Sequence, residues 1–252
     1  MDASYASLKG KAVFISGGAS GIGEAIVRAF AAQGAHVGFV DIAAAEGDKL
    51  VAELAGLGHK VHFRKCDITD IPAYQAAIAD LAAKTGPFGV LVNNAANDQR
   101  HKLEDVTPEF FDNRIAVNMR HMLFAIQSVI PHMVKAKAGS IINLGSISWM
   151  MPSGGYPVYA ACKASVHGLT RTLARDYGKS GIRFNTLVPG WVMTKRQLEL
   201  WVDEAGEKLM DQSQCLAGRV MPDDIAAMAL FLASDDSRMI SAQEFIVDGG
   251  WV

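Results

Sequence analysis

Short apolar runs alternate with longer amphipathic stretches along the whole chain, and this alternation restricts the possible folds more than any other feature. The runs are continuously apolar, which indicates strands buried on both faces, as in a parallel sheet. Parallel neighbours need crossover helices, so the repeated units predict a doubly wound α/β sheet flanked by helices on both faces. The predicted strands are Lys11–Ser16, Ala35–Val40, Lys60–Lys65, Val90–Val92, Ser140–Leu144, Ile182–Val188 and Glu244–Val247. The predicted helices are Ile22–Gln33, Ala44–Leu57, Pro72–Thr85, Pro108–Lys135, Tyr156–Lys179, Arg196–Gln212 and Asp223–Ala233.

The 252 residues show no sign of a second domain. There is no linker rich in proline or serine, no low-complexity tract and no repeat of fixed period, so residues 1–252 are expected to form one domain. Half of the residues are apolar and a fifth are charged, as in ordinary soluble globular proteins. The formal charge of −2 gives no reason to expect nucleic acid or an acidic membrane as a partner.

The cysteines and the N-terminus indicate a cytoplasmic protein without a metal site. Cys66, Cys162 and Cys215 lie far apart and follow no Cys-x-x-Cys spacing, which argues against zinc and fits a reducing compartment. The first residues lack the basic flank and apolar run of a signal peptide. No apolar stretch is long enough to cross a bilayer.

A glycine-rich turn follows the first predicted strand and reads Gly17-x-x-x-Gly21-x-Gly23, with Ser20 and Ile22 between the glycines. In a strand–turn–helix context, such a turn lets a pyrophosphate approach the free N–H groups of a helix N-terminus. The spacing is looser than Gly-x-Gly-x-x-Gly and lacks the lysine of a P-loop. It therefore predicts a Rossmann-like dinucleotide site, with a purely structural turn as the alternative.

Asp41 directly follows the second predicted strand and precedes Ile42. An acidic side chain at this place can accept hydrogen bonds from both ribose hydroxyls of an adenosine. Its charge would repel a 2′-phosphate, and neither neighbour supplies a cation. The position favours NAD over NADP, unless Asp41 only caps the following helix.

Further polar residues follow the third and fourth predicted strands. Asp67 and Ile68 come after one, and Asn94 and Ala95 come after the other. Ligands of open α/β sheets bind beyond the carboxyl ends of the strands. These residues are candidate adenine and ribose contacts, although each could also be an ordinary loop residue.

The stretch from Ser146 to Lys163 carries the equipment for proton transfer. Tyr159 and Lys163 are four residues apart, so a helix would place the phenol and the ammonium on one face. A phenol has a pKa near 10, and a cation beside it is expected to lower that pKa toward the working range. Ser146 adds a hydroxyl that can hold the reacting oxygen. The stretch predicts chemistry on a hydroxyl or a carbonyl.

Taken together, these motifs resemble the short-chain dehydrogenase/reductase family, in family order from residue 10 to the C-terminus. The matching pieces are Gly17–Gly23, Asp67, Asn93-Asn94-Ala95, Asn118, Ser146, Tyr159-x-x-x-Lys163 and Pro189-Gly190. Three residues differ from the usual pattern, namely Ser16, Ala96 and Cys162, and none of them removes a catalytic group.

The resemblance implies a role for each matching residue. Tyr159 would be the general acid/base, Lys163 would lower its pKa and bind the nicotinamide ribose, and Ser146 would orient the reacting oxygen. Asn118 would hold a water of the proton relay. The stretch containing Pro189, Gly190, Val192 and Thr194 resembles the loop that covers the nicotinamide carboxamide. Tyr156 is not the expected base, because the residue four positions later is Ala160.

The substrate side resembles bacterial aldose 1-dehydrogenases, which oxidise the anomeric hydroxyl of a cyclic sugar to a lactone. A sugar pocket needs hydrogen-bonding partners and an aromatic surface for the apolar face of the ring. The candidates are Asn97, Trp149, Trp191, Arg196 and Gln197, with a lid at about residues 191–215. Three more residues stay open: Asp98 and Arg100 can pair with each other or lie at a subunit contact, and His101 can be a solvated loop residue. The loop Met150–Tyr156 departs from the xylose-type pattern, so the sugar itself is not fixed.

The sequence therefore predicts NAD-dependent oxidation of an aldose to its lactone, with Tyr159 as the base. Alternatives within the enzyme class are a dehydrogenase or reductase of a polyol, a steroid or a 3-oxoacyl thioester. The polar loop Asn97–Lys102 argues against a steroid. A nicotinamide-sensing binding protein is the alternative of another class, although it would be expected to lack the tyrosine or the lysine. The long helices Pro108–Lys135 and Tyr156–Lys179 imply a homotetramer by resemblance only.

Overall fold

The computed structural model describes residues 3–252, and it contains one seven-stranded parallel sheet. The strands lie in the order β3-β2-β1-β4-β5-β6-β7, which is a doubly wound arrangement. Their bounds are β1 Ala12–Ser16, β2 His36–Asp41, β3 Lys60–Lys65, β4 Val90–Asn93, β5 Gly139–Leu144, β6 Ile182–Pro189 and β7 Glu244–Val247. The predicted fold class and all seven predicted strands are confirmed to within one residue at each end.

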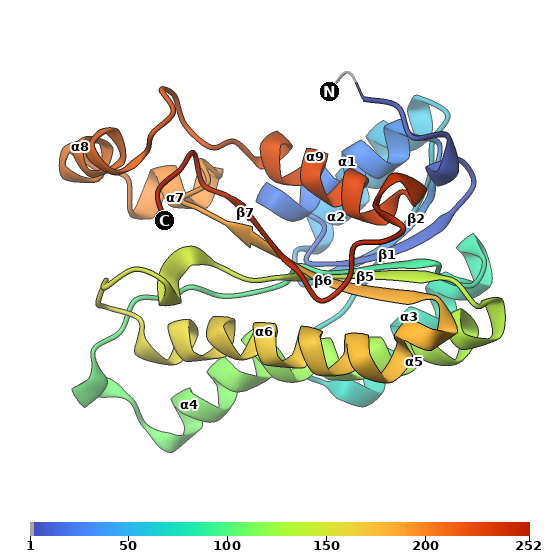
Figure 1. Ribbon diagram of the computed structural model, residues 1–252, viewed down its shortest axis with the longest axis horizontal. Helices are drawn as coiled ribbons and strands as arrows, with labels where there is room; N and C mark the ends of the chain where they lie inside the picture. Colours follow the sequence, from blue (N-terminus) through green and yellow to red (C-terminus); the bar gives the residue numbers. More distant parts are fainter. Residues whose placement is uncertain (1–2) are drawn as a thin grey trace.

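Helices cover both faces of the sheet (Figure 1). On one face lie α1 Gly21–Ala32, α2 Ala44–Gly56 and α9 Pro222–Ala233. The other face carries α3 Ile71–Thr85, α4 Pro108–Ile115, α5 His121–Ala136 and α6 Pro157–Tyr177. Two short helices, α7 Lys195–Leu200 and α8 Glu204–Ser213, lie beyond the end of the sheet.

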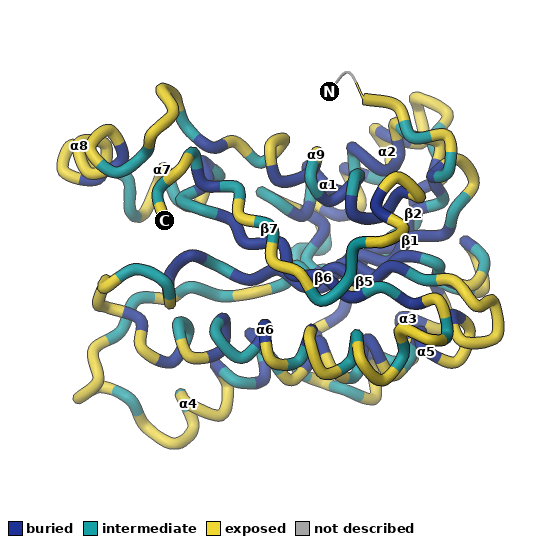
Figure 2. The backbone as a smooth tube through the Cα atoms, viewed as in Figure 1, coloured by how far each residue is buried: buried dark blue, intermediate teal, exposed yellow. Residues whose placement is uncertain are grey.

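The core has one part on each side of the sheet, as a sheet buried on both faces requires. All five residues of β1 are buried, and their side chains alternate between the two parts. Val13 and Ile15 pack toward α1 and α9, whereas Phe14 packs toward α3 and α5. Figure 2 shows the buried strands between helices whose outer surfaces are exposed.

Two predicted helices are interrupted in the structure, and a side-chain hydrogen bond or a helix cap lies at each interruption. The helix predicted over Pro108–Lys135 is divided by a π-helical turn at Ala116–Arg120, where the Asn118 side chain donates to the Arg114 carbonyl at 3.0 Å. The helix predicted over Arg196–Gln212 is two helices, because Asp203 begins α8 by accepting from the Gly206 N–H at 2.8 Å.

Four of the segments that carry predicted site residues leave the sheet at the same edge. The glycine-rich turn follows β1, the loop of residues 94–102 follows β4, the Ser146 turn follows β5, and residues 190–215 follow β6. The sheet order changes direction between β1 and β4, which is where ligands of doubly wound folds bind. No helix of residues 3–252 is long and apolar enough to cross a membrane.

Candidate active site

The glycine-rich turn is held by residues that follow β4. The Ser16 hydroxyl accepts from the backbone N–H groups of Asn94 and Ala95, both at 3.1 Å. The Asn94 amide donates to the Ser16 and Gly17 carbonyls at 3.0 and 2.9 Å. Gly17 has φ of 68°, and a Cβ there would lie 2.9 Å from the Cα of Ala95. A Cβ at Gly23 would collide with the Gly17 carbonyl, so this turn has room only for glycine at both places.

Asp41 lies at the end of β2, and its carboxylate is shared with the same turn. One oxygen accepts from the Ala19 N–H and the other from the Ala43 N–H, both at 3.0 Å. Each carboxylate oxygen has a further lone pair, so both can also accept from a ligand hydroxyl. The neighbouring Ile42 side chain is 67 % exposed and brings no charge. Asp41 thus fixes the loop and keeps acceptor capacity at its surface.

The remaining cofactor candidates lie at the same sheet edge and differ in burial and in hydrogen bonding. The Asp67 carboxylate accepts from the Thr69 N–H and hydroxyl, both at 2.8 Å, while Ile68 is buried. Pro189 ends β6, and the next N–H, that of Gly190, donates to the Val247 carbonyl at 2.9 Å.

The first residues of the predicted lid reach the glycine-rich turn. Val192 is buried, and Thr194 caps α7 by accepting from the Gln197 N–H at 3.3 Å. A Cβ at Gly21 would lie 3.2 Å from Thr194, so the start of α7 touches this turn. Ser20 is the N-cap residue of α1, and Ile22 follows in its first turn. The structure therefore gathers the predicted cofactor residues at one edge.

Tyr159 and Lys163 lie on the inner face of α6, next to the turn that follows β5. The Lys163 ammonium is 1 % exposed, donates to the Leu144 carbonyl at 2.8 Å and lies 5.7 Å from the centre of the Tyr159 ring. Burial lowers the pKa of Lys163 to about 8. A lysine with such a pKa exchanges its proton readily near neutral pH.

The pKa of Tyr159 is raised in the polypeptide, contrary to the expectation from its lysine neighbour. Burial is the largest cause, and the negative charge of Asp98 adds to it. Hydrogen bonding from Ser146 acts in the opposite direction and lowers the pKa, as does the positive charge of Arg100. Desolvation thus outweighs the cations, and Ser146 is the strongest group that favours the phenolate.

Asn118 lies in the π-helical turn and is fully buried. Its side-chain oxygen accepts from the Asn97 N–H at 2.8 Å, and its amide nitrogen donates to the Asn97 carbonyl at 3.2 Å. Asn118 therefore fixes the loop after β4 to the π-helical turn. The Asn97 side chain accepts from the Gln99 N–H at 2.9 Å within its own loop.

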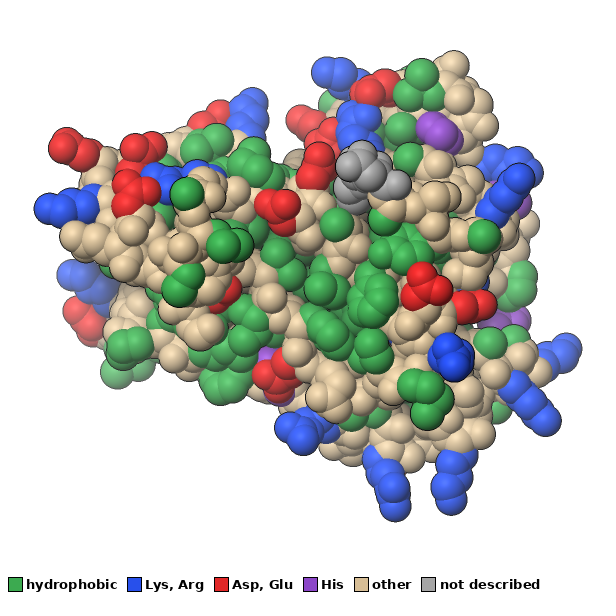
Figure 3. Space-filling view, turned by 45° about the horizontal axis from the view of Figure 1, so that its top comes forward, with side chains coloured by type: hydrophobic (Ala, Val, Ile, Leu, Met, Phe, Trp, Pro, Cys, Tyr) green, Lys and Arg blue, Asp and Glu red, His purple; other side chains and the backbone are tan. Residues whose placement is uncertain are grey.

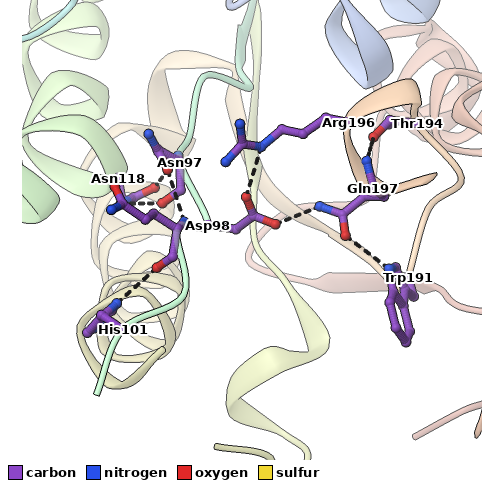
Figure 4. Close-up of polar contacts among 9 residues, drawn as sticks. Asn97, Asp98, His101, Asn118, Trp191, Thr194, Arg196 and Gln197 are labelled. Atoms are coloured by element: carbon purple, nitrogen blue, oxygen red, sulfur yellow. Dashed lines mark hydrogen bonds and ion pairs between the residues drawn. The ribbon is translucent and has the colours of Figure 1, made fainter. Parts of the chain in front are cut away.

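Asp98 connects the loop after β4 to the segment after β6 (Figure 4). Its carboxylate accepts from the Gln197 amide at 2.6 Å and from the Arg196 Nε at 3.3 Å. The Gln197 oxygen in turn accepts from the Trp191 indole N–H at 2.9 Å. Three of the predicted substrate residues, Trp191, Arg196 and Gln197, are thus joined through the Asp98 carboxylate, whose role the sequence left open.

Arg100 lies between aromatic rings from two other loops. Its guanidinium is 4.3 Å from the ring centre of Tyr156 and 5.2 Å from that of Trp201, between α7 and α8. Asp98 and Arg100 do not form the pair considered from sequence. His101 is a structural tie, since its ring nitrogen accepts from the Val158 N–H at 3.3 Å and its backbone N–H donates to the Gly155 carbonyl at 2.8 Å.

Trp149 lies apart from the Asp98 contacts. Its indole N–H donates to the Nε2 of His167 at 3.0 Å, and the two rings meet edge to face at 4.8 Å between centres. His167 is two helical turns beyond Tyr159 along α6. The Trp149 side chain is 40 % exposed.

Sequence reasoning left the roles of Asp98 and Arg100 open and did not consider His121, and the structure places all three near Tyr159 or Lys163. Asp98 and Arg100 both act on the pKa of Tyr159, and their signal was the run of polar residues after β4. His121 is fully buried near Lys163, and burial lowers its pKa to about 3, so it is neutral. The sequence carries no signal for His121, because it lies within an ordinary helical pattern.

Comparison with known proteins agrees with this geometry. A family profile described as "Enoyl-(Acyl carrier protein) reductase" matches residues 17–252. The D-xylose 1-dehydrogenase of Caulobacter vibrioides is 47 % identical over 247 residues, covering 98 % of each chain. The chain belongs to the short-chain dehydrogenase/reductase family. It is therefore an oxidoreductase, as predicted.

Two further proteins of known name or structure are similar to this chain over nearly its whole length. The probable galactose dehydrogenase GalD of Rhizobium meliloti is 43 % identical, covering 98 % of this chain and 96 % of the relative. The crystal structure of a blue fluorescent protein from a metagenomic library, in complex with NADPH, is 33 % identical and superposes with a TM-score of 0.88, covering 98 % of this chain and 99 % of the other.

The residues present fit the nicotinamide cofactor that the family implies. A Cβ at Gly17 or Gly23 would lie too close to neighbouring backbone atoms, so the turn stays open for a pyrophosphate. The helix α1 begins at this turn with its free N–H groups. Asp41 is available at the end of β2, and the fold places it beside the same turn. Among residues 3–252, no group of three or more His, Cys, Asp or Glu side chains is arranged to hold a metal ion.

Proposed function

We propose that this protein oxidises the anomeric hydroxyl of an aldose sugar to a lactone, with NAD as the hydride acceptor. The observation that carries the proposal is the joint presence of Tyr159, Ser146 and Lys163 at a sheet edge whose neighbouring loops carry polar side chains. The curated relatives at 47 % and 43 % identity are sugar dehydrogenases, which supports the same substrate class.

The proton chemistry falls to residues on α6 and the turn after β5. Oxidation removes a proton from the anomeric hydroxyl and a hydride from C1, which leaves the lactone carbonyl. Ser146 donates to the reacting oxygen and Tyr159 takes its proton. The Lys163 ammonium, 5.7 Å from the centre of the Tyr159 ring, would favour the phenolate by its positive charge. Asn118 holds the outgoing water. When bound, NAD supplies the site that accepts the hydride.

A hydrophilic substrate is favoured by the polar groups that meet between the loop after β4 and the segment after β6. Asp98, Arg196 and Gln197 offer carboxylate, guanidinium and amide groups, and sugars are recognised by such partners. Trp191 donates to Gln197 and adds an aromatic surface. Asn97, on the loop after β4, is a further candidate partner of the sugar. Trp149 remains a candidate wall residue. Residues 191–215 would form a lid over the sugar.

NAD is preferred to NADP in this proposal because of Asp41. Its negative charge lies at the end of β2, where an adenosine ribose of a cofactor on the glycine-rich turn would lie. Asp67, Ile68, Asn94 and Ala95 would complete the adenine and ribose site, with Ile42 beside it. Lys163 would bind the nicotinamide ribose, and Pro189, Gly190, Val192 and Thr194 would cover the carboxamide.

A homotetramer in the cytoplasm completes the proposal. Large apolar side chains are exposed on α4 and α5, at Phe111 and Leu123, and near the C-terminus, at Ile246 and Val252. Figure 3 shows apolar side chains gathered across the middle of one face. The three cysteines are free, which suits a reducing compartment.

A panel of pentoses and hexoses, assayed with NAD and with NADP by the absorbance of the reduced cofactor, tests this proposal. We expect turnover of at least one aldose with NAD and trapping of the lactone by hydroxylamine. Matched linear polyols, such as xylitol beside xylose, are the control. Turnover of polyols without turnover of any aldose would overturn the proposed substrate class.

A further inference from the structure

One face of α6 carries three functional side chains at a spacing of four residues: Tyr159, Lys163 and His167. Residues at this spacing lie one above another on a helix, so all three face the end of β5. Lys163 donates to the Leu144 carbonyl at 2.8 Å, and Ser146, just beyond β5, lowers the pKa of Tyr159 by hydrogen bonding. His167 makes the third contact, with Trp149 at 3.0 Å.

The tautomer of His167 follows from its two partners. The Trp149 indole can only donate, so the Nε2 of His167 must be the acceptor and carries no proton. The proton is then on Nδ1, which contacts a carboxylate oxygen of Glu244, at the beginning of β7. Glu244, His167 and Trp149 thus form a chain of polar contacts from β7 through α6 to the turn after β5, in which the bond from the Trp149 indole to Nε2 is a hydrogen bond. The chain fixes the orientation of the imidazole ring.

Trp149 is rigidly connected to Ser146. The turn Ile147–Trp149 begins at Ser146, whose hydroxyl accepts from the Ser148 N–H at 3.1 Å. The Met150 N–H closes the turn on the Ile147 carbonyl at 2.8 Å. A constraint on the Trp149 ring is therefore transmitted through a short hydrogen-bonded turn to the Ser146 hydroxyl.

We propose that His167 is a positioning residue, which holds Ser146 against Tyr159 by anchoring Trp149 to the helix that carries the base. The inference rests on the proposed function, because it concerns the same reaction. Lys163 attaches α6 to the last residue of β5, and His167, one helical turn later, attaches it to the turn that follows β5. The pair fixes both the distance and the rotation of the Ser146 turn relative to the phenol.

Substitution of His167 tests the proposal, because Ser146 favours the phenolate of Tyr159. The other charged or titratable groups around the phenol are Asp98, Arg100, Tyr156 and Lys163, and the variants leave them unchanged. In His167→Leu the indole has no acceptor, and we expect kcat to fall about ten-fold. The rise of kcat with pH should move upward by about half a pH unit, since the phenolate loses part of its stabilisation. His167→Gln retains an acceptor for the indole and should restore most of the activity.

Three further measurements separate positioning from a general loss of stability. Trp149→Phe keeps the ring but not the donor, and should shift the pH profile in the same direction. His59→Leu, on the loop between α2 and β3, is the matched control and should leave the profile unchanged. Nitrogen NMR of the His167 ring should show a protonated Nδ1 and an unprotonated Nε2, without any substrate.

Two results would overturn the proposal. One is a pH profile of His167→Leu that matches wild type, even when kcat falls together with the thermal stability. The other is an NMR spectrum that places the proton on Nε2. Failure of the proposed function is a separate outcome, because it would appear as a wild-type enzyme that oxidises no aldose.

Discussion

The cofactor side and the substrate side of the sheet edge are built by different means. On the cofactor side the contacts are made by the backbone and by short side chains. Asn94 and Asp41 bond to the main chain of the turn after β1, and Ser16 accepts from the backbone of the loop after β4. On the substrate side, long side chains from separate loops meet one another. Asp98 reaches Arg196 and Gln197, and Arg100 reaches Trp201.

This difference has a physical consequence for how each side responds to change. Backbone contacts in a glycine turn allow few other residues or conformations at the turn itself. The cofactor side should therefore tolerate changes in the surrounding loops without changing its shape. Contacts between long side chains can be exchanged one at a time, so the substrate side can vary its specificity on a constant frame. The two sides meet at Tyr159 and Lys163, where substitution should affect both.

The largest effect is expected at that meeting point. Tyr159→Phe removes the proton acceptor and should lower kcat by about 10³-fold, within the range of general acid–base catalysis. Binding of the reduced cofactor, followed by its fluorescence, should be almost unchanged, because the turn after β1 is held by other residues. Tyr177→Phe at the end of α6 is the control. More than a few per cent of residual turnover would remove Tyr159 from the role of the base.

The next effect isolates the cofactor side. Asp41→Asn removes the charge but keeps one acceptor, and should reduce the preference for NAD over NADP by about ten-fold in kcat/KM. Asp41→Ala also removes the acceptors of the Ala19 and Ala43 N–H groups, so it should weaken both cofactors in addition. The KM for the sugar should stay constant in Asp41→Asn. An unchanged cofactor ratio would leave Asp41 with only its structural contacts.

The same contrast explains which features sequence reasoning could predict. The strands, the glycine turn and the placing of Asp41, Ser146 and Lys163 follow from local patterns and from the rule that parallel strands end at one edge. The contacts of Asp98 do not, because its partners lie 98 and 99 residues away in the chain. The raised pKa of Tyr159 was also beyond reach, since the lysine spacing is visible in the sequence while the degree of burial is not.

The break between α7 and α8 shows a similar limit. The amphipathic pattern continues through Trp201, so periodicity alone predicts one helix. Asp203 caps a new helix, and this competing local signal decides the structure. Likewise the π-helical turn depends on the hydrogen bonds of Asn118 to a distant loop, which no pattern within the helix can reveal.

A smaller effect should isolate the substrate side. Asp98→Asn weakens the contacts to Arg196 and Gln197, and should raise the KM for the sugar about five-fold while leaving the KM for NAD unchanged. The carboxylate of Asp98 raises the pKa of Tyr159, so its neutralisation should lower that pKa. Because the phenol must be deprotonated to act as the base, the rise of kcat should move to lower pH. Asp105→Asn, exposed in the same loop region, is the control; an equal effect there would contradict the assignment.

The smallest effect concerns the thermal stability of the protein, to which the buried Lys163 contributes. Burial lowers the pKa of Lys163 from 10.5 to about 8, so the unfolded chain binds more protons between these values. The wild-type protein therefore gains stability as the pH rises from 8 to 10.5, and it bears the full cost of the buried charge below pH 8. Lys163→Met removes that cost but also the bond to Leu144, so at pH 7 we expect Tm to rise by only about 2 °C. The difference should shrink and then reverse as the pH approaches 10.5, because the wild type keeps the Leu144 contact. Thermal unfolding at several pH values measures this. A Tm difference that does not depend on pH would show that burial of Lys163 does not disfavour its charged form.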